Sequence, residues 1–400
     1  MSGSNIVDNK KIFGATMLVT GCCIGAGMIG LPILSAVTGF MPTMLAMVFC
    51  YLFTTVTGLL LVEATLWFEG RVNLPSIVEF ALGRTGKIIT IILFLFLFYC
   101  LFVAYLDGGG NLFAEMLGYV LHTKVPHYVG VLSCMLFIAS IAYAGAKSAD
   151  KVNRLLLAGL VISYFTLVAI GLPQVHQENL LFKDWSAVFG VVPILLLCFG
   201  YQNLVPSLSN YLHKNAKAIR IAILIGNLIP FLIYFIWIYV ILGMLPANHA
   251  TIGDDTEMVA GLLSAATTSV SVIFFIKSFS MFAMLTSFLP SALSFVDFLK
   301  DGLGKLLHQR VRNDLPIFLL VFMPPTLCAL IYPRIFLHAL SFAGGFIDVL
   351  LFGILPALVV LVGRRIRLGE SAYQVIGGTF TPALILVTSA ILLAFKVHSL

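Results

Sequence analysis

Long apolar blocks alternate with short polar connections along the whole chain. A helix needs about 20 consecutive apolar residues to cross the roughly 30 Å of hydrocarbon in a bilayer, and most of these blocks are that long. The sequence therefore predicts an all-α integral membrane protein with eleven transmembrane helices. The predicted spans are residues 12–38, 42–66, 88–119, 128–146, 154–172, 187–211, 218–245, 268–299, 314–332, 334–362 and 379–397.

Composition supports the membrane class. Hydrophobic residues make up 60% of the 400 residues and charged residues only 10%, with a mean hydropathy of +1.07. In soluble domains about a quarter of the residues are charged. The net charge of +6 would suit nucleic acid in a soluble chain. Here the basic residues lie between apolar blocks, so we expect the lipid bilayer as the partner and no nucleic acid.

The distribution of basic residues predicts the orientation of the chain. With the N-terminus in the cytoplasm, eighteen of the 23 Lys and Arg residues fall in cytoplasmic segments, four fall outside and Lys277 lies within a span. Positive residues favour the cytoplasmic side, so we predict a cytoplasmic N-terminus and a periplasmic C-terminus. No signal peptide is expected. Residues 1–400 are predicted to form a single transmembrane domain.

The first span carries an unusual cluster of helix-breaking residues. The stretch GCCIGAGMIGLP places Gly21, Gly25, Gly27 and Gly30 ahead of Pro32. Non-helical backbone at membrane depth is tolerated where it lines a cavity or binds a ligand. Beyond such a break, the new helix start presents free N–H groups that suit a carboxylate. We therefore predict that this span is interrupted.

The sixth span repeats the signal in LCFGYQNLVPSLSNY, where Gly200, Gln202, Asn203 and Pro206 fall in mid-membrane. Paired interruptions in matching halves are the best sequence indication of a transporter's central site. We predict a five-plus-five inverted repeat, with residues 1–172 and 187–362 as its halves and 379–397 as an additional helix. The alternative is that the glycines pack helices closely and the prolines merely kink them.

Four segments resemble the hydroxy and aromatic amino acid permeases, a family of the amino acid/polyamine/organocation superfamily. They are IGAGMIGLPILSAVTGF, FGYQNLVPSL, MLTSFLPSALSFVDFL and FMPPTLCALIYPRIF, and the likeness spans nearly the whole chain. The resemblance implies a symporter of the bacterial inner membrane that is driven by the proton gradient. It also implies a substrate site at both breaks. The expected substrate-binding residues are Ile24, Gly25, Ala26, Gly27, Tyr105, Phe199, Gly200, Tyr201 and Gln202.

Similarity to the sodium-coupled members of the same fold implies a cation site. Its oxygen ligands would suit sodium, so the resemblance leaves the coupling ion open between a proton and sodium. No other cofactor is expected. The implied sodium ligands are Gly21, Ile24, Ala283, Thr286 and Ser287.

Charged residues inside predicted spans are costly and are functional candidates by default. Lys277 could carry a proton or replace a cation, or its stem could extend to the interface. Asp107 could meet the substrate ammonium, pair with Lys277 or lie in a solvated vestibule. The resemblance suggests that Glu63 supports the unwound backbone of the two broken helices. We expect Asp297 and Asp348 to pair with basic residues or cap helices.

Together these patterns predict a secondary active symporter that imports an aromatic amino acid, with tyrosine as the leading candidate. The alternatives are a tryptophan-selective or broader neutral amino acid permease, or a passive channel or exporter. No nucleotide-binding or hydrolase motif occurs, so we do not expect an enzyme. The seven cysteines show no CxxC pair and are expected to be packing residues. The sequence does not fix the oligomeric state, and we expect a monomer.

Overall fold

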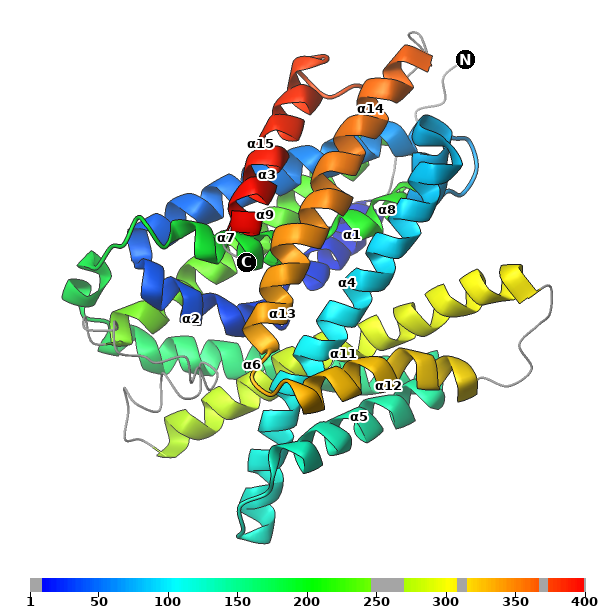
Figure 1. Cartoon of the computed structure of the whole chain (residues 1–400). Coiled ribbons are helices and arrows are strands. Elements are labelled where there is room, and N and C mark those ends of the chain that lie inside the picture. The colour runs from blue at the N-terminus through cyan, green and yellow to red at the C-terminus, as the bar shows by residue number, and fades with distance from the viewer. Residues whose placement is uncertain (1–8, 246–269, 308–314, 367–372, 399–400) are drawn as a thin grey trace.

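The computed structural model describes residues 9–245, 270–307, 315–366 and 373–398 (Figure 1). Positions 268, 269 and 314 of two predicted spans lie outside these residues. Every regular element of the described chain is a helix; the described residues contain no strand, only an isolated bridge between Gly39 and Lys183. The predicted all-α class is therefore confirmed.

Eight helices in the described part of the chain are long and apolar enough to cross a membrane. A ninth span results if α1 (Asn9–Cys23) and α2 (Gly27–Thr38) count as one bent span. Two further apolar helices, α5 (His127–Tyr143) and α12 (Leu315–Ile331), have 17 residues each. That length lies at the lower limit for crossing a bilayer. The total of eleven spans and the inverted repeat remain predictions.

The other elements follow in chain order. They are α3 (Phe40–Thr65), α4 (Leu74–Leu121), α6 (Ala146–Gly171), η1 (Leu172–Gln174), η2 (Gln177–Leu181), α7 (Val188–Cys198), η3 (Gln202–Leu204), α8 (Val205–Tyr211), α9 (Ala216–Met244), α11 (Val270–Leu307), α13 (Phe336–Phe342), η5 (Ala343–Ile347), η6 (Val349–Ile354), α14 (Leu355–Ile366) and α15 (Phe380–His398).

The helices form two packed groups that α4 joins (Figure 1). In one group α1 packs against α9, and α3 contacts α7, α9 and α14. In the other group α11 packs against α6, and α5 and α12 pack against α4. The broken spans lie in the first group, where α2 contacts α7. This arrangement brings both interruptions into the interior of the bundle.

Helix α4 begins well before the predicted span 88–119, because local signals extend it. The Asn73 side chain accepts a hydrogen bond from the Ser76 N–H at 3.0 Å and caps the helix. Gly83 then kinks the helix at a φ of 71°, a conformation that disfavours other residues. The charged pair Glu79 and Lys87 lies on either side of this kink. A search for apolar runs therefore misses the first 14 residues.

The predicted span 334–362 is not a regular α-helix. Its middle is π-helical over Ala343–Ile347 and Val349–Ile354, between α13 and α14. Here a Cβ atom at Gly344 would overlap the carbonyl of Pro193 on α7. The absent side chain allows the π-helical backbone to lie directly on α7. Such segments occur frequently at functional sites.

Candidate functional site

The predicted interruption of the first span is confirmed. Helix α1 ends at Cys23, α2 begins at Gly27, and the two axes differ by 55°. The Cys23 carbonyl, which would bond within a continuous helix, instead accepts a hydrogen bond from the Tyr234 hydroxyl at 2.5 Å. The indole N–H of Trp237 donates to the carbonyl of Met28 at 3.1 Å. Side chains of α9 thus hold the backbone on both sides of the break.

The backbone N–H groups at this break differ in availability. The N–H of Ala26 donates to Ser287 Oγ on α11 at 3.0 Å. Among the described residues, the N–H groups of Gly25 and Gly27 have no hydrogen-bond acceptor. Helix α2 starts at this point, so its partial positive charge adds to theirs. Two of the three successive N–H groups can therefore bind an anionic group.

The sixth span is also interrupted, as predicted. Helix α7 ends at Cys198, and Phe199–Tyr201 are not helical. A short 3₁₀ turn, Gln202–Leu204, then leads into α8. Pro206 occupies the first turn of α8, where its missing N–H breaks no helical hydrogen bond. Within the interruption the backbone makes short-range bonds instead of helical ones: the Phe199 carbonyl accepts the Tyr201 N–H at 3.1 Å, and the Tyr201 carbonyl accepts the Leu204 N–H at 2.9 Å.

The two breaks contact each other. The Cys22 thiol lies 3.6 Å from the Gly200 carbonyl oxygen and 3.8 Å from Asn203 Oδ1. A Cβ atom at Gly27 would lie 2.7 Å from Cys198 Sγ, so this glycine permits the close approach of α2 to α7. Cys22 is exposed, which corrects its expected role as a packing residue. It contributes a polar contact between the interrupted segments.

The structure shows why position 25 is a glycine, and this reason could not be seen in the sequence. A Cβ atom at this position would overlap Ser287 Oγ. The glycine therefore makes room for α11, in addition to any access it gives a ligand. A substitution at Gly25 would disturb helix packing before it could obstruct a substrate.

The side chains predicted around the second break point away from it. Tyr201 and Phe199 are fully buried, and the Tyr201 hydroxyl donates to the Thr54 carbonyl on α3 at 3.1 Å. Gln202 Nε2 lies 3.3 Å from the hydroxyl of Thr57. Only the backbone of Phe199–Gln202 remains for the predicted contacts with a substrate. Tyr105 on α4 is also buried, with its ring packed 5.5 Å from that of Phe288.

Of the predicted cation ligands, those on α11 lie together and are engaged with one another. The hydroxyls of Thr286 and Ser287 both donate to the Ala283 carbonyl, each at 3.1 Å. Ser287 also accepts the N–H of Ala26, so it joins α11 to the first break. Gly21 lies in the last turn of α1 and is exposed.

Of the three roles considered for Asp107, the pairing with Lys277 and the solvated vestibule position are both wrong. Asp107 is fully buried and accepts hydrogen bonds from the backbone N–H groups of Arg334 and Phe336, each at 3.0 Å. It therefore caps the start of α13, and His127 Nε2 lies 3.3 Å from the same carboxylate. Lys277 instead forms an ion pair with Glu115 at 3.0 Å, and both side chains are more than two-fifths exposed.

The expected contact of Glu63 with the broken helices is also wrong. Its fully buried carboxylate forms a bidentate ion pair with Arg364 of α14, at 2.6 and 2.7 Å. It accepts a third hydrogen bond from the N–H of Val375 at 2.7 Å. Glu63 thus fixes the end of α3 to α14 and to the segment that precedes α15. The bidentate geometry of arginine favours such buried pairs.

Asp348 was expected to pair or cap, and it does neither. Only 5% of it is exposed, and both carboxylate oxygens lack a hydrogen-bond partner within the described structure. A Cβ atom at Gly200 would lie 3.8 Å from Asp348 Oδ2, so the carboxylate lies beside the second break. Sequence reasoning missed this group because its surroundings come from distant segments. The signal available was an aspartate deep inside a predicted span.

Two interrupted spans in contact within a bundle of apolar helices define a multi-pass membrane protein with the broken-helix arrangement of secondary transporters. The sequence profile of the tryptophan/tyrosine permease family matches residues 8–396. The chain therefore belongs to this family, which confirms the resemblance seen in the sequence.

Individual relatives match over nearly their whole length. The chain is 31% identical to the tyrosine-specific transport system 1 of Haemophilus influenzae over 389 residues, 96% of each chain. It is 28% identical to a tryptophan-specific transport protein of Pseudomonas aeruginosa, covering 94% of this chain and 91% of the relative. It is 27% identical to glutamine transporter 2 of Aliivibrio fischeri, covering 97% of this chain and all of the relative.

Proposed function

We propose that this protein is a secondary active symporter that imports an aromatic amino acid, with tyrosine as the preferred substrate. It would work in the bacterial inner membrane by alternating access, coupled to protons. The observation that carries the proposal is the contact between the two interrupted spans, at Cys22 and Gly200. Family membership and the tyrosine-specific relative support the substrate class.

Backbone N–H groups at the first break and backbone carbonyls at the second match the two charged groups of an amino acid. The N–H groups of Gly25 and Gly27 would bind the substrate carboxylate, aided by the start of α2. The carbonyls of Phe199–Gln202 and of the end of α1 would accept hydrogen bonds from its ammonium. This recognition uses only backbone atoms of the protein, so it would accept any amino acid with an unmodified α-ammonium and α-carboxylate group.

Side-chain selectivity would then come from the helices around the breaks. Tyr105 and Phe288 form an aromatic pair between α4 and α11. Aromatic rings pack favourably against one another, so this pair is the best candidate to meet an aromatic substrate. A tryptophan-selective or broader neutral amino acid permease remains the alternative, because relatives include tryptophan and glutamine transporters.

We further propose the eleven-span topology, with inverted repeats over residues 1–172 and 187–362 and both breaks at equivalent positions. The cytoplasmic N-terminus and periplasmic C-terminus follow from the basic residues. Exposed polar positions on one side of the breaks would line a vestibule open to the cytoplasm. They are Cys22 on α1, Asn203 on η3, Ser207 on α8, and Ser294 and Asp297 on α11, and the exposed Gly21 lies beside Cys22.

Protons are preferred to sodium as the coupling ion because of the bonding on α11. The hydroxyls of Thr286 and Ser287 already donate to the Ala283 carbonyl, and Ser287 also accepts the Ala26 N–H. Sodium would have to replace several of these hydrogen bonds with its own coordination. Coupling to a proton would not require the hydrogen bonds of Thr286, Ser287 and Ala283 to break.

The test is uptake of labelled tyrosine by the purified protein in liposomes. A proton gradient and a sodium gradient are imposed separately, and unlabelled tyrosine, tryptophan, phenylalanine and glutamine compete in parallel. We expect accumulation with the proton gradient alone and the strongest competition from tyrosine. Equal competition by glutamine would replace the aromatic proposal with the broader permease, and equilibration without accumulation would indicate a passive pathway.

A further inference from the structure

Asp348 combines features that no structural role explains. It joins the two π-helical segments Ala343–Ile347 and Val349–Ile354 in the middle of the α13–α14 span. Its two oxygens are buried and without a hydrogen-bond partner in the described structure. Burying an unpaired carboxylate costs several kcal/mol or more, so the charged form is unfavourable there. Binding a proton removes that cost.

The ionisable groups around Asp348 offer little compensation for its charge. The cysteine thiols and the tyrosine phenol around Asp348 are neutral near pH 7, so they cannot balance its negative charge. Among the groups named below, only the lysine carries a positive charge. The aliphatic stem of Lys396 reaches Gly345 on the neighbouring η5 segment, and its ammonium lies 2.9 Å from Ser341 Oγ. Helix α3 contributes the uncharged Phe53 and Thr54. Cys22 on α1 and Cys100 and Tyr105 on α4 interact electrostatically with Asp348. The packed helix α7 carries Cys198 as its ionisable side chain, and α15 brings Lys396 to Gly345.

A small cavity connects Asp348 to the second break. It has a volume of about 10 Å³, room for roughly one water molecule. Asp348 and Gln202 both line it, and Gln202 Oε1 is also without a hydrogen-bond partner. One water molecule could donate its two hydrogens to these two oxygens. A change in the charge of Asp348 would therefore act directly on the interrupted segment.

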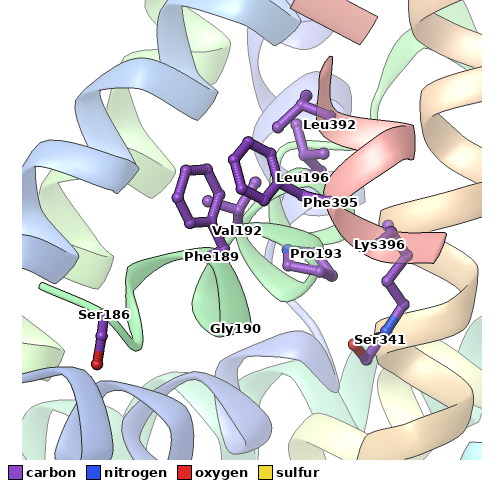
Figure 2. A pocket seen from close by; sticks show the side chains of 11 residues that line it. Ser186, Phe189, Gly190, Val192, Pro193, Leu196, Ser341, Leu392, Phe395 and Lys396 are labelled. Carbon is purple, nitrogen blue, oxygen red and sulfur yellow. Dashed lines mark hydrogen bonds between the residues drawn. The ribbon is translucent and has the colours of Figure 1, made fainter. Parts of the chain in front are cut away.

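A larger pocket leads toward this cavity from the side of α15. It has a volume of about 210 Å³ and lies between α7, α15 and the α13–η5 segment (Figure 2). Lys396 and Ser341 lie at one wall, and Phe189 and Phe395 stack at another. Leu196 lines both this pocket and the small cavity. The Leu196 side chain is thus a wall that the pocket shares with the small cavity beside Asp348.

We propose that Asp348 is the residue that binds the coupling proton, which reaches it through the pocket of Figure 2 and past Leu196. This inference rests on the proposed symport function. In each cycle the carboxylate takes up one proton from the outer side and becomes a neutral carboxylic acid. After the breaks rearrange, the acid releases that proton to the cytoplasmic side and regains its charge. No bond other than O–H forms or breaks.

The test compares Asp348→Asn with the wild-type protein in liposomes that contain a pH-sensitive dye. The amide keeps the size of the side chain but cannot bind and release a proton near neutral pH. We expect Asp348→Asn to exchange labelled for unlabelled tyrosine across the membrane at a rate near that of wild type. Substrate-driven acidification of the lumen and gradient-driven accumulation should be lost. Asp348→Glu should retain both.

Asp150→Asn is the matched control, because Asp150 is an exposed carboxylate on α6 that pairs, within the described structure, only with the exposed Arg154. We expect this variant to retain substrate-driven acidification. Retained acidification in Asp348→Asn would overturn the proposal, and so would loss of exchange together with acidification, which would show a structural or substrate-binding role. Wild-type protein that neither exchanges nor accumulates tyrosine, tryptophan or glutamine would instead reject the symport function itself. Wild-type accumulation with sodium alone would leave symport intact and overturn the role of Asp348.

An independent measurement needs no transport. The infrared spectrum of the purified protein should contain a protonated carboxyl band that disappears with alkaline titration and is missing in Asp348→Asn. An identical band in wild type and variant would contradict the proposal.

Discussion

Ser287 Oγ accepts a hydrogen bond from the backbone N–H of Ala26 at 3.0 Å, and this bond fastens the first break to α11. The same hydroxyl donates to the Ala283 carbonyl at 3.1 Å, so both its donor and an acceptor site are used. Gly25 leaves the space that this hydroxyl occupies. The glycine and the serine therefore form one structural unit, although 262 positions separate them in the sequence.

Gly25→Ala should destabilise the protein, because its Cβ atom would overlap Ser287 Oγ. The overlap should cost about 1–3 kcal/mol, typical of overpacking. Combining it with Ser287→Ala should restore part of that stability, since the second change removes the clashing oxygen. Thermal denaturation in detergent and tyrosine uptake of all four proteins measure this coupling. If Gly25→Ala were as stable as wild type but abolished uptake with and without Ser287→Ala, the glycine would serve the ligand rather than the packing.

Asp107→Ala should lower the thermal stability strongly. The change removes the acceptor of two N–H groups at the start of α13, the part-buried one of Arg334 and the buried one of Phe336. Leaving buried donors unsatisfied costs about 1–3 kcal/mol for each group. Asp107→Asn, which keeps one acceptor oxygen, should lose less. The midpoints of thermal denaturation give the order, and equal midpoints for the two variants would argue against the capping role.

Glu63→Gln should destabilise the protein by about 3–5 kcal/mol, because it leaves Arg364 without its buried counter-charge. Uptake per folded molecule should remain, since Glu63 does not contact either break. Glu79→Gln is the control: its partner Lys87 is 36% exposed, and exposed pairs contribute less than about 1 kcal/mol. Loss of uptake in fully folded Glu63→Gln would restore a role for this residue in transport.

Lys277→Met should leave both stability and transport close to wild type. The ion pair with Glu115 is exposed on both sides, and such pairs contribute about 0–1 kcal/mol. Tyrosine uptake under a proton gradient, with thermal denaturation alongside, checks this expectation. A complete loss of gradient-driven uptake would contradict this prediction and would indicate that Lys277 takes part in coupling.

The sequence predicts the helical class and both breaks because these depend on local chemistry. A run of apolar residues must form hydrogen bonds within itself in lipid, and Gly25 and Pro206 act on the backbone where they stand. The first residues of α4 are not predicted in this way, because they include charged residues and so interrupt the apolar run, although Asn73 caps a helix there. Local signals therefore reveal where a span exists and where it is interrupted, but they set its ends less well.

The roles of the buried charges could not be predicted, because they depend on which distant segment supplies a partner. Asp107 finds its partners 227 and 229 positions away in backbone N–H groups, which no side-chain pattern reveals. Glu63 finds Arg364 across 301 positions. Asp348 has the opposite outcome and finds none in the described structure. Three buried carboxylates therefore have three different environments: Asp107 caps a helix, Glu63 forms an ion pair, and Asp348 has no partner in the described structure.

The contact between the two breaks has a mechanical consequence. A thiol is a weak donor, so the link from Cys22 to Gly200 costs little to release. Around it, the Asp107 cap and the Glu63–Arg364 pair are charge-assisted and far harder to separate. The contact between the two breaks is therefore weaker than these two buried contacts elsewhere in the bundle. We expect a rearrangement to begin where the interrupted segments meet, while the Asp107 cap and the Glu63–Arg364 pair stay in place.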